Sequence, residues 1–329
     1  SEAGKLSRAM APLLGSYLGF AVLPGGRASA PGQLSIRSMR QIQELLNESI
    51  RPSPLLPGTF DVLNLVLLGN PIRHSLSPLM HNTALSAMKL AGQYGAFCVS
   101  DTQAAIAGIR GMNIRGASVT IPLKTEVMEY LDEIDPDALA LGAVNTIVND
   151  AGKLTGYNTD WLGLVQALKA KMTIAGKAFA ILGAGGTARA AAYGILKEGG
   201  RPIIVNRTED RGSALATRFD CPFYPLAAVG KVSADVLINT TSVGLHPQMD
   251  QSPVDAAILA GYPYVMDVIY NPLKTKLLRD AEVKGCKTIS GLDMFVRQGA
   301  LQLKLWTGKD APLALMQKIV RERLEERES

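Results

Sequence analysis

The chain is poor in aromatic residues and cysteine, and each shortage excludes a class of protein. Only 5% of its 329 residues are aromatic although 47% are hydrophobic. The apolar content is therefore mostly aliphatic, which is typical of buried parallel strands covered by helices. The three cysteines, Cys98, Cys221 and Cys286, lie far apart and form no CxxC pair. This spacing argues against a disulfide framework and against a zinc site.

Charge clusters, long apolar runs and grouped histidines are also missing. The net charge is +5, but lysine and arginine are scattered, so nucleic-acid binding is not indicated. The longest apolar runs, such as 63–68, have the length of a strand and are too short to span a membrane. His74, His81 and His246 lack ligand spacing, so we expect structural histidines and no metal. No secretory signal is recognisable, and we expect a cytoplasmic protein, or a plastid one if the source is a plant.

A glycine-rich turn between two apolar strands is the most informative motif that is present. Residues 179–182 are apolar, Gly183-Ala184-Gly185-Gly186 follows, an alanine-rich helix comes next, and 202–205 form a second apolar run. This order is typical of the first βαβ unit of a dinucleotide-binding domain. Glycines permit the tight turn and let a pyrophosphate approach the helix N-terminus, where unpaired N–H groups favour anions.

The end of the second apolar strand indicates which dinucleotide fits. A carboxylate there would bind the ribose 2′-hydroxyl of NAD, but this chain has Asn206 and Arg207, with Thr208 and Arg211 close behind. Guanidinium groups suit a 2′-phosphate. The sequence therefore predicts NADP as the cofactor.

Two further segments have the residue types of a small-molecule site. Ser75 and Ser77 alternate along an extended stretch that enters a helix near Pro78, so two hydroxyls can face one carboxylate. Without other evidence, an N-cap and a surface serine explain the pattern equally well. Lys124 follows the apolar strand 116–120, at the sheet edge where ligands collect. A single lysine in such a place is more often a solvated surface group.

Together these motifs resemble the shikimate dehydrogenase family, which interconverts 3-dehydroshikimate and shikimate. The motifs HSLSPxxHN, VTxPxK, GAVNT, GxNTD, GAGGxxRA, NTTSVG, DVIYNP and GLDMFVRQG occur in the family's order between Gly69 and Gly299. The resemblance implies an α/β fold of two domains, an N-terminal substrate-binding open sheet and a C-terminal NADP-binding Rossmann domain. It places the substrate domain at 61–160 plus 292–329 and the cofactor domain at 161–291.

The resemblance also implies roles for individual residues. Lys124 and Asp160 match the family's catalytic pair, which suits proton transfer to a ring carbonyl without a metal. The implied substrate ligands are Ser75, Ser77, Thr120, Asn145, Tyr270 and Gln298. The implied cofactor residues are Gly183, Ala184, Gly185, Gly186, Asn206, Arg207, Thr208, Arg211, Thr240 and Gly291.

The chain departs from the family pattern at two of these motifs. Ser118 stands where the family usually has asparagine, and we expect only a local hydrogen bond to change. Phe295 stands where an aliphatic residue is commoner, which would alter packing over the nicotinamide.

Residues 1–57 resemble a different family, the type I 3-dehydroquinate dehydratases. Arg8, Ser29 and Gln33 match substrate-contacting positions near the end of that barrel. The barrel needs about 250 residues, and its Schiff-base lysine and catalytic histidine have no match here. We expect a fragment of a bifunctional dehydratase–dehydrogenase without dehydratase activity, with 52–57 as a linker; a linker that only resembles the motif is the alternative.

Two other functions stay open at the level of sequence. A quinate/shikimate dehydrogenase using NAD or both cofactors is the nearer one, although Arg207 argues against NAD. A non-catalytic sensor of the quinate pathway is the more distant one, since Lys124 and Asp160 are both retained.

Overall fold

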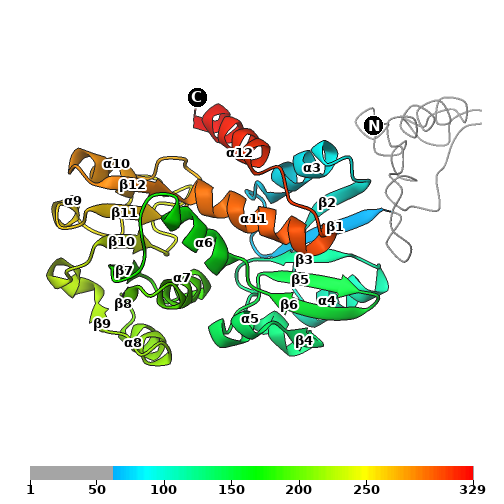
Figure 1. Ribbon diagram of the computed structural model, residues 1–329, viewed down its shortest axis with the longest axis horizontal. Coiled ribbons are helices and arrows are strands. Elements are labelled where there is room, and N and C mark those ends of the chain that lie inside the picture. The colour runs from blue at the N-terminus through cyan, green and yellow to red at the C-terminus, as the bar shows by residue number, and fades with distance from the viewer. Residues whose placement is uncertain (1–61, 329) are drawn as a thin grey trace, which may run out of the picture. The chain divides into compact units, whose positions relative to one another are not determined.

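The computed structural model describes residues 62–328, which form two α/β parts, each built on a six-stranded sheet (Figure 1). The segment assigned to a dehydratase remnant, 1–57, lies outside the described residues. Among the described helices, none is long and apolar enough to cross a membrane.

The first sheet has the strand order β2-β1-β3-β5-β6-β4. Its strands are β1 (Leu63–Gly69), β2 (Gly92–Cys98), β3 (Gly116–Val119), β4 (Glu133–Ile134), β5 (Thr146–Asp150) and β6 (Lys153–Tyr157). The pairs of β1 with β2 and β3 are parallel, as the alternation of strands and helices predicts, but β5 runs antiparallel to β3 and β6. The β5–β6 connection is a tight hairpin in which Ala151 and Gly152 both have positive φ.

The second sheet is entirely parallel, with the order β12-β11-β10-β7-β8-β9. Its strands are β7 (Ala178–Leu182), β8 (Arg201–Asn206), β9 (Phe223–Pro225), β10 (Val236–Asn239), β11 (Tyr264–Asp267) and β12 (Lys287–Ser290). The order reverses between β7 and β10, as in the doubly wound dinucleotide-binding fold. Ligands bind at such a switch point, beyond the carboxyl ends of the strands.

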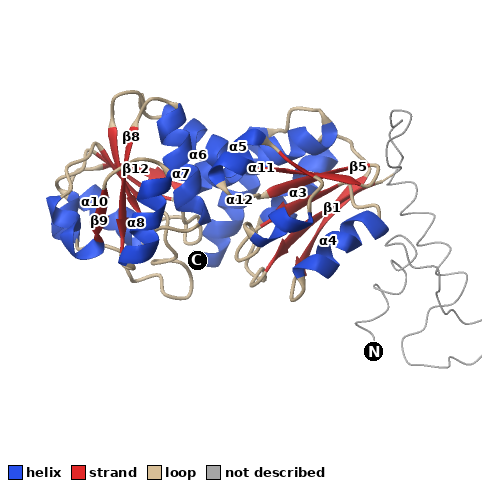
Figure 2. Cartoon of the chain, turned by 90° about the horizontal axis from the view of Figure 1, so that it is seen from below, coloured by secondary structure: helices blue, strands red, loops and turns tan. Residues whose placement is uncertain are grey.

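Helices cover both faces of each sheet (Figure 2). In the first part these are α3 (Ser77–Ala87), α4 (Thr102–Gly111), η2 (Glu126–Tyr130) and α5 (Pro136–Leu141). In the second part they are α7 (Gly186–Lys197), α8 (Glu209–Arg218), η3 (Leu226–Lys231), α9 (Ala256–Leu259) and α10 (Lys276–Val283). Both faces of each sheet are therefore packed with aliphatic side chains.

Three further helices connect the two parts or return to the first one. They are α6 (Asp160–Lys169), which leads into the second part, α11 (Gly291–Thr307) and α12 (Leu313–Glu328). Helix α11 packs along α6, and α12 packs on α3, so the last residues of the chain cover the first sheet (Figure 1). Trp306 of α11 lies so close to Gly116 that a Cβ there would come within 2.1 Å of its indole nitrogen. The absence of a side chain at Gly116 therefore allows α11 to pack closely against β3.

Candidate active site

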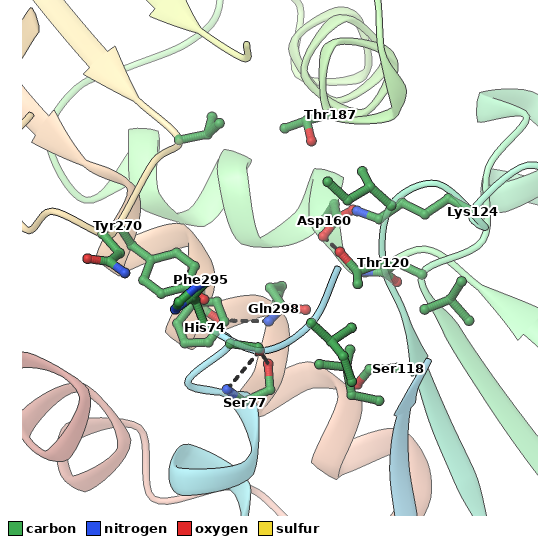
Figure 3. A pocket seen from close by; sticks show the side chains of 18 of the residues that line it. His74, Ser77, Ser118, Thr120, Lys124, Asp160, Thr187, Tyr270, Phe295 and Gln298 are labelled. Atoms are coloured by element: carbon green, nitrogen blue, oxygen red, sulfur yellow. Dashed lines mark hydrogen bonds and ion pairs between the residues drawn. The ribbon is translucent and has the colours of Figure 1, made fainter. Parts of the chain in front are cut away.

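A cavity of about 360 Å³ lies between the two parts and is lined by residues of both. All predicted catalytic and substrate-binding residues line it: Ser75, Ser77, Thr120, Lys124, Asn145, Asp160, Tyr270 and Gln298. Figure 3 shows Lys124 and Asp160 beside Thr120, with Tyr270 and Phe295 on another wall. The structure thus brings together residues that are up to 223 positions apart (298 − 75).

Lys124 and Asp160 form a close ion pair in this cavity. The Lys124 Nζ lies 2.6 Å from Asp160 Oδ2, and the two side chains are only 15% and 9% exposed. Lys124 follows the end of β3, and Asp160 is the first residue of α6, where a carboxylate is stabilised by the helix dipole. Asn145 Nδ2 donates to the other carboxylate oxygen, Oδ1, at 2.8 Å. Both carboxylate oxygens of Asp160 therefore accept a hydrogen bond, and these bonds fix the positions of the carboxylate and of the Lys124 ammonium.

Ser75 and Ser77 lie at the N-terminus of α3. The Ser77 amide and the Ser75 hydroxyl are 3.2 Å apart, and the two hydroxyl oxygens are also 3.2 Å apart. Leu76 gives the helix no side-chain cap. Two hydroxyls and the uncapped amides of a helix start together form a site that suits a carboxylate.

Tyr270 and Phe295 form another wall of the cavity. Their rings stack with centroids 4.1 Å apart and planes inclined by 19°. Burial raises the pKa of Tyr270, so its phenol stays protonated and can donate to an anion. Gln298 Nε2 donates to the Phe295 carbonyl at 2.8 Å, which fixes the Gln298 side chain at the edge of the cavity.

A buried carboxylate supports the loop that carries Tyr270. Asp267, at the end of β11, accepts hydrogen bonds from Asn239 Nδ2 at 3.0 Å, Ile269 N at 3.1 Å and Thr275 Oγ1 at 2.7 Å. Burial raises its pKa to about 6, although the three donors oppose the shift. Asp267 thus joins the ends of β10 and β11 beside the cavity.

None of the predicted cofactor residues lines the cavity, but the glycine-rich turn lies next to it. Gly183 has φ of +117°, and a Cβ there would come within 2.7 Å of Thr240 Oγ1. Helix α7 begins at Gly186 without a side-chain cap, and a Cβ on Gly186 would lie 3.6 Å from Lys124 Cδ. The glycine-rich turn is therefore in reach of the lysine. Thr187, the next residue of α7, does line the cavity.

The other predicted cofactor residues fall into two groups. Arg207, Thr208 and Arg211 are exposed beyond the end of β8, and Asn206 Nδ2 donates to the Thr208 carbonyl at 2.7 Å. Gly291 begins α11, and a Cβ there would lie 2.3 Å from the Val268 carbonyl oxygen. Close packing of backbone against backbone is enough to require glycine at this position.

Several polar residues that line the cavity were not predicted as ligands, among them Ser118, Gln302, His74 and His246. Ser118 of β3 is two positions before Thr120, which follows the strand, and Gln302 is one turn after Gln298 on α11, so the spacing could have revealed both. His74 and His246 also line it, with ring centroids 5.4 Å apart. Within residues 62–328 no three histidine, cysteine, aspartate or glutamate side chains gather as a metal site would need.

Known proteins resemble this chain over most of its length. A family model for the shikimate dehydrogenase substrate binding domain matches residues 67–147, and one for the shikimate 5′-dehydrogenase C-terminal domain matches 291–321. The shikimate dehydrogenase (NADP(+)) of Moorella thermoacetica is 43% identical over 270 residues, covering 78% of this chain and 92% of its own. The chain belongs to the shikimate dehydrogenase family.

Solved structures of the family have the same two-part architecture. The Thermus thermophilus shikimate 5-dehydrogenase, crystallised with NADP(H) and shikimate, is 38% identical with a TM-score of 0.73, covering 79% of this chain and 99% of its own. A quinate dehydrogenase from Corynebacterium glutamicum in complex with NAD is 27% identical with a TM-score of 0.74 over the same shares. The predicted fold class, a substrate-binding α/β part followed by a Rossmann part, is thereby confirmed.

A third family model, type I 3-dehydroquinase, matches residues 1–50. The match agrees with the resemblance seen at Arg8, Ser29 and Gln33, all of which lie outside the described residues.

Proposed function

We propose that the protein is an NADP-dependent shikimate dehydrogenase, which reduces 3-dehydroshikimate to shikimate reversibly. The observation that carries the proposal is the Lys124–Asp160 pair, which lines the same cavity as Ser75 and Ser77 and lies beside the glycine-rich turn at Gly186. One end of this cavity suits a carboxylate and the other suits a reacting oxygen. Relatives that are about 40% identical over most of the chain carry the same activity in their names.

The residues at the carboxyl ends of β7 and β8 fit NADP. The uncapped start of α7 leaves amides free for a pyrophosphate, and Gly183 and Gly186 keep side chains out of the approach. Arg207 and Arg211 supply guanidinium groups that can bind the 2′-phosphate of NADP. The ribose diol of NAD would not need these positive charges. When bound, NADPH supplies the hydride.

The side chains of the cavity would then position the acid and move the proton. Ser75, Ser77 and the protonated Tyr270 hold the carboxylate, while Thr120, Asn145 and Gln298 surround the ring hydroxyls. Lys124 gives a proton to the carbonyl oxygen during reduction and takes it back during oxidation. Asp160 orients the Lys124 ammonium, because it accepts from Nζ at 2.6 Å and is itself fixed by Asn145.

The domain limits also belong to this proposal. Residues 61–160 and 292–329 form the substrate domain, and residues 161–291 form the cofactor domain. The return of α12 onto α3 supports the assignment of the chain's last part to the first domain. We further propose that residues 1–57 derive from a dehydratase of the preceding pathway step. The matched segment, 1–50, is far shorter than the barrel of about 250 residues to which it corresponds.

A quinate dehydrogenase is the second candidate, since one solved relative is named so and was crystallised with NAD. A spectrophotometric assay of all four pairs of shikimate or quinate with NADP or NAD separates the candidates. We expect the highest kcat/KM for shikimate with NADP. A preference for quinate with NAD would contradict the proposal, and the absence of turnover with every pair would favour a binding protein.

A further inference from the structure

Three buried polar residues in the floor of the cavity have no part in the proposed mechanism. They are Tyr94 of β2, Ser118 of β3 and Gln302 of α11, which are 3%, 5% and 2% exposed. Ser118 and Gln302 line the cavity, and Tyr94 lies directly behind Ser118. Burying three such groups is costly unless each is hydrogen-bonded, so their partners show what they do.

The direction of each bond on the Ser118 side follows from chemistry. Gln302 Nε2 lies 3.2 Å from the Asn145 carbonyl oxygen, which can only accept, so the amide nitrogen faces that way. Gln302 Oε1 then faces Ser118 Oγ at 2.8 Å, and Ser118 must donate to it. The Ser118 oxygen is left to accept from the Tyr94 hydroxyl at 2.7 Å.

The same reasoning orders the bonds on the other side of Gln302. Its Nε2 also donates to Thr146 Oγ1 at 3.1 Å. The Thr146 hydrogen points to Asn145 Oδ1 at 2.7 Å, an oxygen that also accepts from the Thr159 amide. The Asn145 amide nitrogen is thereby turned to Asp160 Oδ1 at 2.8 Å. Every donor in this series points toward Asp160.

We propose that Gln302 is a positioning residue for catalysis, the middle link of a one-way hydrogen-bond chain that runs Tyr94, Ser118, Gln302, Thr146, Asn145, Asp160. Hydrogen bonds in series polarise one another, so a chain that ends on a carboxylate stabilises its negative charge and fixes its direction. The other oxygen of Asp160 holds Lys124, so the chain acts on the reacting group through two contacts. The inference rests on the proposed function and deepens it.

Ser118 can link Tyr94 to Gln302 because a single hydroxyl serves both bonds. A hydroxyl accepts from one neighbour and donates to the next in line, and the space beside Ser118 is filled by Gln302. Ser118 and Gln302 together thus connect β3 to α11 across the floor of the cavity.

Three variants test the chain with steady-state kinetics for shikimate and NADP. Gln302→Met keeps the shape and removes the link, and we expect kcat to fall about 10-fold, the equivalent of about one hydrogen bond, with KM nearly unchanged. Gln302→Glu places an oxygen against the Asn145 carbonyl, so kcat should fall at least as far. Tyr94→Phe removes only the most distant donor and should lower kcat less than Gln302→Met.

The matched control is Leu303→Val, a packing change at the next position of α11, whose side chain is fully buried in the core. It should lower the melting temperature and leave kcat unaltered. The hydrogen-bond chain has no positioning role if kcat in Gln302→Met equals that of the wild type. The same conclusion follows if all four variants lose kcat in proportion to the decrease in their melting temperatures. An inactive wild type would overturn the proposed function itself, so the two failures are distinguishable.

Discussion

At the scale of single residues, Lys124 carries the clearest chemical role. Its ammonium is nearly buried and paired to Asp160, and it belongs to the first part of the molecule. The glycine-rich turn belongs to the second part. Proton transfer and cofactor binding are thus assigned to residues of different parts, and a change at Lys124 should affect mainly the first.

We therefore expect Lys124→Ala to lower kcat by about 10²–10⁴-fold, the usual contribution of a general acid–base group. The dissociation constant of NADP, measured by calorimetry, should stay nearly unchanged. Lys153→Ala is a suitable control, because Lys153 is exposed and paired to Glu133 on the surface. Retention of most of the turnover in Lys124→Ala would remove the lysine from the mechanism.

Arg207 is the residue on which cofactor choice should depend. Arg207→Asp replaces a charge-assisted contact to the 2′-phosphate with repulsion, so kcat/KM for NADP should fall much further than kcat/KM for NAD. Arg201→Asp is the control, since Arg201 lies at the opposite end of the same strand, β8. An unchanged ratio of the two kcat/KM values would show that Arg207 does not contact the phosphate.

At the scale of elements, the buried Asp267 ties the ends of β10 and β11 together, and its ionisation affects stability. Its folded pKa is raised to about 6, above an ordinary value near 3.8. The folded state therefore binds the proton more tightly than the unfolded state. The stability contributed by this group is complete below pH 4 and is lost as the pH rises through 6.

Asp267→Asn should remove that loss. The amide can keep its oxygen toward Asn239 and Ile269, so the variant should fold. The free energy of unfolding of the variant, relative to the wild type, should rise between pH 4 and 7 by up to about 3 kcal/mol. Denaturant unfolding at several pH values measures it. Asp235→Asn is the control, because hydrogen bonding lowers the pKa of Asp235 and its ionisation therefore affects stability only below about pH 4. Its difference from the wild type should be nearly flat between pH 4 and 7; a flat difference for Asp267→Asn would contradict the argument.

Helix α5 of the first part is attached to the second part by side chains of two helices, α7 and α8. Arg218 of α8 donates to the Ala140 and Leu139 carbonyls at the C-terminus of α5, and Lys197 and Tyr193 of α7 both bind Asp137. Arginine at a helix C-terminus satisfies carbonyls that have no partner within the helix. These contacts hold the GAVNT segment, and with it Asn145, against the cofactor-binding part.

Arg218→Ala should loosen this attachment. We expect amide hydrogen exchange in residues 136–143 to become about 5-fold faster, the equivalent of about 1 kcal/mol of hydrogen bonding. Arg323→Ala, on the exposed side of α12, should leave exchange in these residues unaltered. Equal exchange in both variants would mean that the α5 contacts do not restrain the segment.

The sequence predicted most elements and missed those whose signals are not local. Apolar runs and glycines identified the parallel strands of the second sheet, because buried strands and tight turns leave a local pattern. The β5–β6 hairpin was missed, since its turn at Ala151 and Gly152 lies between two motifs that were interpreted for their chemistry. Gln302 was missed because a polar residue on a helix usually faces solvent; its spacing from Gln298 was a local signal, but its burial comes from the packing of α11 onto the first part.

At the scale of the whole molecule, the cavity takes residues from both parts, so its geometry depends on how the parts close. Lys124 and Gly186 approach each other across it, and Thr187 and His246 of the second part line it together with Ser77 and Lys124 of the first. Closure of such a cavity excludes water before hydride transfer. The family resemblance implied which residues serve each ligand, whereas the width of the cavity could not be inferred from sequence.

The return of α11 and α12 to the first sheet also affects the order in which the chain can fold during synthesis. One face of the first sheet is covered by side chains from the last helices, among them Leu303, Trp306 and Met316. These residues leave the ribosome after the whole second part has been made. The second sheet can therefore be completed first, while one apolar face of the first sheet stays uncovered until α11 and α12 have been made. A nascent chain that stops before residue 291 would present that face to chaperones.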